Sequence, residues 1–173
     1  AISDKNKDQL VKTSSLYQIK NTYIDYKLLL DSNQIDLLCV ATRTHGRKDI
    51  IKLAIEKGVK ALHVEKPLCN SMEELNDLES IIKEKKILIT IGTLRSLFDI
   101  YQKAKDIVDS GVYGKLTQIQ VNFGKASLFW THAHSVDIIL FFAGLRALNG
   151  VQAFLSNIDL NTMNGEVEQD PIV

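Results

Sequence analysis

Three short apolar runs, at residues 35–41, 59–64 and 87–91, constrain the fold more than any other feature of the sequence. A continuous apolar run of this length is typical of a strand that is buried on both faces of a parallel sheet. Segments with helical spacing of apolar residues separate the runs, and crossovers of that kind require parallel strands with right-handed connections. The pattern predicts a partial doubly wound, Rossmann-type α/β fold, the class that binds dinucleotides.

Local signals place the helices of this first half. Residues 1–3 are interpreted as the end of a strand, followed by a helix over 7–17 that Asn6 or Asp4 can cap, and by a second helix over 23–31. A helix after residue 46 ends before Gly58, and Ser71 with a glutamate three residues later forms a capping box that opens a helix to about residue 85.

The second half of the sequence has a different order of elements. It predicts a helix over 98–110, an alternating strand over 115–123, a very apolar helix over 135–142 and a further strand over 151–160. Alternation favours half-exposed strands, so we expect the start of an α+β domain with an open, mostly antiparallel sheet. Residues 1–93 would form the dinucleotide-binding domain, and residues 94–173 the beginning of a C-terminal substrate and oligomerisation domain.

Charge and hydropathy exclude several classes of function. The formal net charge is +0, which argues against nucleic acid or an anionic membrane as a partner. The sequence has neither an apolar run long enough for a membrane span nor a signal-peptide pattern at its first residues. Cys39 and Cys69 are interpreted as buried free thiols rather than a disulfide, so we expect a cytoplasmic protein. Both ends of the chain look unfinished, and we expect truncation at each.

Two groups of residues lie where a Rossmann-type sheet would bind a dinucleotide. Asp4 ends the first strand, where an acid can accept hydrogen bonds from the adenosine ribose and repel a 2′-phosphate, although Lys5 beside it would act in the opposite sense. The second group is the turn with Ala41, Thr42 and His45, which follows a strand and opens a helix. A helix-capping role remains open for both Asp4 and His45.

The tripeptide Glu65-Lys66-Pro67 places two adjacent charges at the end of a buried strand. A partly desolvated lysine at that position can bond a substrate hydroxyl, with its pKa shifted toward neutrality. The alternative is a solvated strand end, and the tripeptide alone does not separate the two.

A second cluster runs from Trp130 to Asp137. His134 and Asp137 are three residues apart, so they share a helical face near the start of the predicted helix. Histidine is the usual general acid or base near neutral pH, and a helix N-terminus would disfavour its charged form. His132 and His134 form an H-x-H pair, but no third ligand of matching character is nearby, so we expect no metal. A purely structural role for both histidines remains the alternative.

Taken together, these pieces resemble the Gfo/Idh/MocA oxidoreductases, the relatives of glucose-fructose oxidoreductase and inositol dehydrogenase. Order and spacing hold across nearly the whole chain. The matching segments are Val40-Ala41-Thr42 with His45, Glu65-Lys66-Pro67-Leu68, Ile91-Gly92 with Arg95, Gly111-Val112-Tyr113-Gly114-Lys115-Leu116, and His134-Ser135-Val136-Asp137.

The resemblance implies an NAD- or NADP-dependent dehydrogenase of a sugar, cyclitol or nucleotide sugar, often a homo-oligomer through its C-terminal sheet. Lys66 would contact both the substrate and the nicotinamide ribose, His134 would accept the proton, and Asp4 would face the adenosine ribose, which slightly favours NAD. Ala41, Thr42, His45, Glu65, Pro67 and Arg95 would line the cofactor, and Asp137 would assist catalysis. Related enzymes also keep a cis peptide bond at Lys66-Pro67, and we predict one here.

Two departures from the family pattern qualify these expectations. The glycine-rich phosphate loop is absent, so we expect the chain alone to bind dinucleotide poorly and to be inactive. Many members carry an acid four residues before the catalytic histidine and a glycine two before it, where this chain has Trp130 and His132. Asp137 or His132 could substitute, the substrate could differ, or the protein could be a non-catalytic sugar- or dinucleotide-binding or assembly protein on the same fold.

Overall fold

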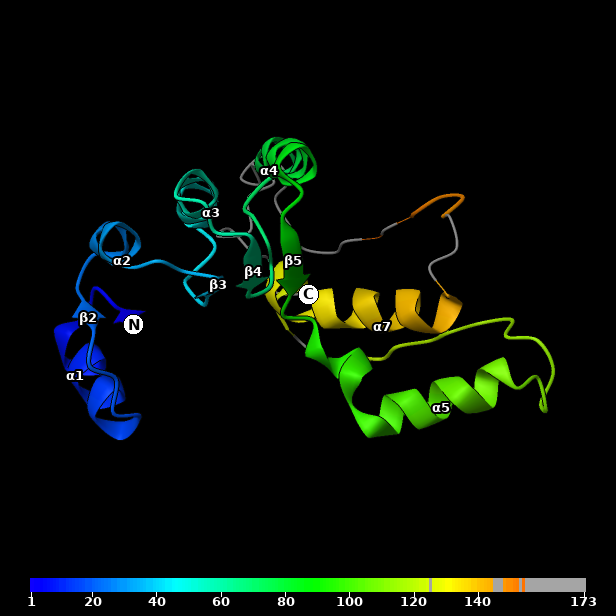
Figure 1. Ribbon diagram of the computed structural model, residues 1–173. Coiled ribbons are helices and arrows are strands. Elements are labelled where there is room, and N and C mark those ends of the chain that lie inside the picture. The colour runs from blue at the N-terminus through cyan, green and yellow to red at the C-terminus, as the bar shows by residue number, and fades with distance from the viewer. Residues whose placement is uncertain (125, 145–147, 153, 155–173) are drawn as a thin grey trace. The chain divides into compact units, whose positions relative to one another are not determined.

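The structure is a computed structural model that describes residues 1–124, 126–144, 148–152 and 154. The chain divides into two compact units (Figure 1). The first contains residues 1–64 and 72–90, and the second contains residues 65–71 together with the chain from residue 91 onward. The segment 65–71 therefore leaves the first unit at the end of one strand and belongs to the second.

The first unit alternates strands and helices as a Rossmann-type fold does. Its elements are β1 (Ile2–Ser3), α1 (Lys7–Leu16), β2 (Thr22–Tyr23), α2 (Tyr26–Ser32), β3 (Leu37–Val40), α3 (Arg47–Glu56), β4 (Ala61–Val64), α4 (Met72–Lys85) and β5 (Leu88–Ile91), the last residue of which belongs to the second unit. The predicted helices over 7–17 and 71–85 are confirmed, with Asn6 as the N-cap of α1.

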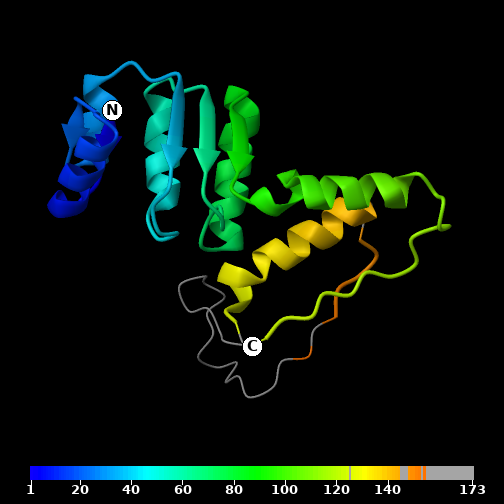
Figure 2. The same cartoon turned by 90° about the horizontal axis from the view of Figure 1, so that it is seen from below.

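The strands form two sheets. β1 pairs with β2 in parallel, with Ile2 opposite Thr22, and a second sheet has the order β3-β4-β5. In that second sheet β3 and β4 are parallel, with Leu37 opposite Ala61, and their arrows point the same way in Figure 2. The prediction that the three apolar runs are neighbours in one sheet is confirmed, and helical crossovers between them explain the parallel pairing.

The hydrophobic core of the first unit lies between its helices and strands. Ile51 and Ala54 of α3, Leu62 and Val64 of β4, and Leu78 of α4 are buried. Helices α3 and α4 contact each other and lie on the same side of the β3-β4-β5 sheet (Figure 1). Burying these side chains removes apolar surface from water, the dominant stabilising term in folding.

The second unit consists mainly of helices in its described part. They are the 3₁₀ helix η1 (Leu94–Leu97), α5 (Asp99–Asp109), the four-residue α6 (Leu128–Thr131) and α7 (Ala133–Ala143). Gly144 ends α7 with a backbone φ of 72°. A left-handed residue at this position is best supplied by glycine. Among the described residues, no helix is both long and apolar enough to cross a membrane.

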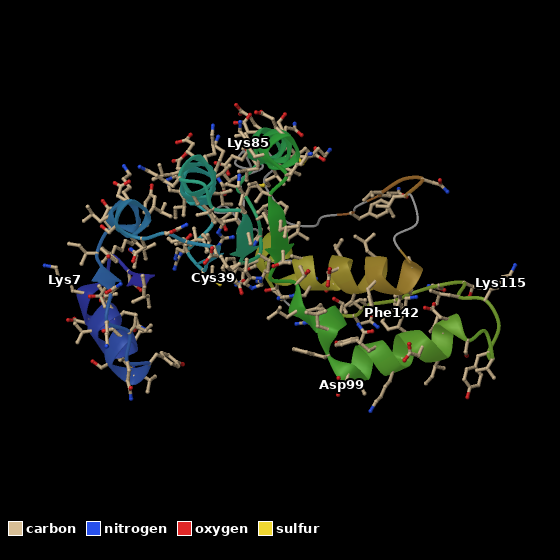
Figure 3. All side chains as sticks on the ribbon, viewed as in Figure 1. Lys7, Cys39, Lys85, Asp99, Lys115 and Phe142 are labelled. Carbon is tan, nitrogen blue, oxygen red and sulfur yellow. The ribbon has the colours of Figure 1, made fainter. Side chains whose placement is uncertain are left out.

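Three expectations about local structure are wrong. The predicted strand over 115–123 is not formed in the described chain. Alternating apolar and polar residues give a segment one apolar face, but a strand also needs a neighbouring strand to form hydrogen bonds with. Tyr23 lies in the short strand β2, and the second helix begins only at Tyr26, after Asp25 caps it. Cys39 is a free thiol, as is Cys69, but Cys39 is exposed because it shares the face of β3 with the exposed Leu37, opposite the face of the buried Val40. Cys39 is labelled in Figure 3. The predicted strand over 151–160 lies largely outside the described residues.

Candidate functional site

Asp4 follows β1 directly, at the carboxyl end of that strand. Its Oδ1 accepts the backbone N–H of Asn6 at 2.8 Å, and Asn6 in turn caps α1 by accepting the N–H of Gln9 at 3.1 Å. The helix-capping alternative for Asp4 is therefore wrong, since Asn6 fills that position. The Asp4 carboxylate shapes the turn that leads into the helix.

The turn after β3 has exposed residues and is held by the buried side chain of Arg47. Ala41, Thr42 and His45 are exposed, and α3 begins after Gly46, a left-handed residue with φ 75°, so His45 does not cap the helix. Arg47 is fully buried and its guanidinium donates to the carbonyl oxygen of Thr42. This contact holds the turn against the helix that follows it.

Sequence reasoning missed Arg47. The available signal was its position on the apolar face of α3, four residues before Ile51 and eight before Ile55. A charged side chain on an otherwise apolar helical face is rarely buried unless it is paired, so its presence there points to a specific polar contact.

Lys66 lies in the segment that joins the second unit. The Lys66-Pro67 peptide bond is cis, which confirms the prediction made for it. Lys66 is 9% exposed, and its backbone N–H donates to its neighbour Glu65 at 3.0 Å from Oε2. The interpretation of this tripeptide as a solvated strand end is thus wrong for Lys66.

Gly92 lies where the end of β5 approaches this segment. A Cβ atom at position 92 would lie 3.1 Å from Oε1 of Glu65 and 3.4 Å from its Cα. The first contact is tight and the second is close to an ordinary van der Waals distance, so a larger residue at position 92 would displace the Glu65 carboxylate by a few tenths of an ångström. The absence of a side chain at position 92 lets the two segments approach closely.

The Lys66 ammonium lies against Trp130, which comes from α6. Its Nζ donates to the Trp130 carbonyl oxygen at 2.5 Å and lies 4.2 Å from the centroid of the indole ring. The two residues are 64 positions apart in the chain. A cation at this distance over an indole face is attracted by the negative charge density of the ring.

His134 and Asp137 lie on the first turns of α7. His134 Nδ1 and Asp137 Oδ2 are buried and have no hydrogen-bond partner among the described residues. Buried polar atoms are nearly always paired, so two such atoms on one helical face mark a place where a ligand can bind.

The surroundings of His134 favour its neutral form. Burial lowers the pKa of His134, and the positive charges of Lys66 and Arg95 lower it further, while the carboxylates of Asp137 and Glu65 act in the opposite direction. The sequence predicted the neutral imidazole from the helix N-terminus, whereas the largest cause is loss of hydration. An imidazole that is neutral at physiological pH can accept a proton.

His132 faces different neighbours from His134. Its ring meets Phe123 edge to face at a centroid distance of 4.8 Å, and its Nδ1 lies 3.5 Å from the Ser135 hydroxyl. The Arg95 guanidinium lies 5.8 Å from the same Phe123 ring. In the part of the chain that the structure describes, no group of three histidine, cysteine or acidic side chains is placed to hold a metal ion.

The comparison with curated proteins finds oxidoreductases, and some of them are named dehydrogenases. The chain is 36% identical over 90 residues to scyllo-inositol 2-dehydrogenase (NAD(+)) of Bacillus subtilis, which covers 52% of this chain and 26% of that protein. It is 23% identical over 121 residues to Oxidoreductase P35 of Formosa agariphila, and this match covers 70% of this chain and 37% of that protein. The matched part of the chain thus spans between 26% and 37% of the length of these relatives.

Solved structures share the fold. Myo-inositol 2-dehydrogenase of Lactobacillus plantarum matches with a TM-score of 0.73 at 23% identity, covering 82% of this chain and 47% of that one. A second match is an oxidoreductase of Agrobacterium radiobacter that was solved with NAD+, L-tartaric acid and magnesium. Its TM-score is 0.74 at 17% identity, and the match covers 83% of this chain and 46% of that one.

The family comparison covers the part of the chain that carries the strands and the turns described above. Residues 1–93, more than half of the chain, match the model of the oxidoreductase family with an NAD-binding Rossmann fold. The alternating strands and helices of the first unit agree with that description. The chain therefore belongs to the Gfo/Idh/MocA family of NAD-binding oxidoreductases.

Proposed function

We propose that the protein of which this chain is part oxidises a secondary alcohol of a sugar or cyclitol, with NAD as the hydride acceptor. The observation that carries the proposal is a buried lysine whose charge acts on His134, an imidazole whose buried Nδ1 has no hydrogen-bond partner among the described residues. Lys66 is buried, and its charge is among the causes that lower the pKa of His134. An alcohol oxidation needs a group that orients the hydroxyl and a base that takes its proton.

The chain's own residues would divide this work. The Lys66 ammonium would donate a hydrogen bond to the substrate oxygen and stabilise the negative charge that develops on it. His134 would accept the hydroxyl proton on its imidazole, and Asp137 would stabilise the imidazolium that results. The nicotinamide ring, when bound, supplies a carbon that accepts the hydride.

The strand ends of the first unit fit a dinucleotide. Ala41 and Thr42 are small and exposed after β3, and the buried Arg47 secures their turn through the Thr42 carbonyl. Such a turn allows a cofactor to approach the backbone at the carboxyl end of a parallel strand. Asp4 would accept hydrogen bonds from the adenosine ribose and disfavour a 2′-phosphate, which is the basis for proposing NAD over NADP.

A binding protein without catalysis is the second candidate, and the position of Trp130 favours it. An indole stands where many members of the family carry an acid, and its carbonyl engages the lysine proposed to orient the substrate. The same fold could then bind a sugar or dinucleotide without transferring a hydride.

The formation of NADH separates the two candidates. The protein would be incubated with NAD+ and a panel of cyclitols, pyranoses and open-chain polyols, and absorbance of reduced nicotinamide would be followed. Turnover that Lys66→Ala abolishes supports the dehydrogenase. Saturable binding of a polyol with no NADH from any member of the panel would overturn it in favour of the binding protein.

A further inference from the structure

Arg95 is a half-buried cation that has no oxygen acceptor in the described part of the chain. It lies in the 3₁₀ helix η1, and its guanidinium makes neither a hydrogen bond nor an ion pair with a described residue. Its Cζ lies 5.8 Å from the centroid of the Phe123 ring, which attracts the charge but offers no oxygen to the five N–H donors. Because a guanidinium that is partly removed from water is normally paired, this one points to an acceptor supplied by a ligand.

Arg95 lies beside the first turns of α7, the helix that carries the proposed base. Helices η1 and α7 contact each other, and the Phe123 ring next to Arg95 also packs edge to face on His132 at a centroid distance of 4.8 Å. His134 follows two residues later, and the charge of Arg95 acts on its imidazole. A ligand that presents a hydroxyl group to His134 can therefore present a second group to the guanidinium.

We propose that Arg95 binds the carboxylate of a sugar acid, an aldonate or a uronate, while His134 takes the proton of one of its secondary hydroxyl groups. This inference rests on the proposed function and names the class of substrate for the same site. In the reaction the hydride of the C–H bond passes to NAD+ and the hydroxyl proton passes to His134. The alcohol becomes a ketone, and the carboxylate bound to Arg95 is unchanged.

The charge and shape of the guanidinium favour a carboxylate over other groups. Its planar fork of N–H donors matches the two oxygens of a carboxylate, and bidentate pairs of this kind are among the stronger hydrogen-bonded contacts in proteins. A phosphate monoester also fits the fork, but it carries roughly −1.5 to −2 charges near neutral pH. The carboxylates of Asp137 and Glu65 act on the same imidazole, so a doubly charged ligand would be repelled more strongly than a monoanion.

Matched pairs of ligands test the carboxylate without any mutation. The full-length protein would be assayed with NAD+ and with glucuronate or galacturonate, each beside the neutral hexose that has a CH2OH group in place of the carboxylate, and gluconate with sorbitol would form an open-chain pair. We expect the best substrate to be an acid, with kcat/KM at least about ten-fold higher than that of its neutral counterpart, the effect of one charge-assisted pair. A neutral sugar that matches or exceeds every acid would overturn the proposal.

Variants separate a carboxylate of the substrate from a phosphate of the dinucleotide, which has the same oxyanion chemistry. On the pH-independent plateau of activity, Arg95→Gln should remove the preference for the acid and leave KM for NAD+ little changed. Arg95→Lys keeps the charge without the fork and should retain part of the preference. The matched control Lys103→Gln removes an exposed positive charge from α5 and should leave the preference unchanged. A raised KM for NAD+ with an unchanged preference for the acid would assign Arg95 to the dinucleotide and overturn the proposal.

Binding measured without turnover distinguishes this inference from the proposed function. Saturation-transfer NMR of the C–H protons of the acid reports binding whether or not NADH forms. A signal from the acid that Arg95→Gln removes, without NADH from any sugar, supports the recognition and rejects the oxidation. NADH formed from neutral sugars as readily as from acids rejects the recognition and leaves the oxidation in place, and neither signal nor NADH rejects both. If circular dichroism shows that Arg95→Gln is unfolded, the comparison of each acid with its neutral counterpart in the unmutated protein still decides.

Discussion

The two units differ in the balance of apolar and polar side chains that they bury. Among the described residues, all buried apolar side chains but Ile138 of α7 belong to the first unit, which also buries the polar Thr44 and Arg47. The buried side chains of the second unit are mostly polar, and the polar ones are Lys66, Asn70 and Ser135. Apolar burial stabilises a fold, while a buried ammonium costs free energy unless neighbours compensate it. We therefore expect mutations in the first unit to act mainly on stability, and mutations in the second unit to act mainly on the chemistry of the site.

The largest effect is expected from the core of the first unit. Leu62→Ala should lower the free energy of unfolding by about 2–5 kcal/mol, because the removed side chain is 2% exposed and leaves a cavity between the strands and helices. Urea unfolding followed by circular dichroism measures this. Leu88→Ala on β5, where the leucine is 74% exposed, is the matched control and should change stability by less than about 0.5 kcal/mol. Similar losses in both variants would contradict the comparison.

The second effect is on turnover in the full-length protein. Lys66→Ala and His134→Ala should each lower kcat by roughly two orders of magnitude, the range supplied by positioned acid and base groups. His132→Ala is the control two residues away and should cost much less, since its ring packs on Phe123. Steady-state kinetics against a panel of sugars would test this. A dead His132→Ala with a nearly normal His134→Ala would mean that the base is the other histidine.

A smaller effect is expected on the pH profile. The base must be neutral, so oxidation should be lost as the pH falls through the pKa of His134, which burial and the charges of Lys66 and Arg95 hold below 6.5. Arg95→Gln removes one of the lowering charges and should move the acidic limb of kcat/KM to higher pH. Asp137→Asn removes a raising charge and should move the limb to lower pH. Shifts in the same direction would exclude His134 as the group that titrates.

The smallest effect is expected at the turn after β1. Asp4→Ala should reduce the preference for NAD over NADP, measured as the ratio of the two kcat/KM values, because the repulsion of a 2′-phosphate is lost. The loss is expected to be roughly ten-fold or less, since the acid is partly exposed and Lys5 follows it. Asp8→Ala on the first turn of α1 is the matched control and should leave the ratio unchanged. An unchanged ratio in Asp4→Ala would remove Asp4 from the ribose site.

The position of the helices and of the buried strands could be predicted because both signals are local. The N-cap Asn6, the helix that follows Ser71, and the left-handed Gly144 each specify an element boundary through neighbours a few residues away. The short strand β2 escaped prediction because two residues carry too little periodicity to be seen.

The Rossmann-type order of the first unit and the candidate site residues could be inferred from the amino-acid sequence alone, except for Arg47. The folded structure was needed to show that residues 115–123 are not a strand, that Cys39 is exposed, and that Lys66 lies against Trp130. The reason is physical. Helix caps and apolar periodicity act through neighbours in the chain. Strand pairing, the covering of one sheet face by helices, and a contact across 64 residues depend on segments that only folding brings together.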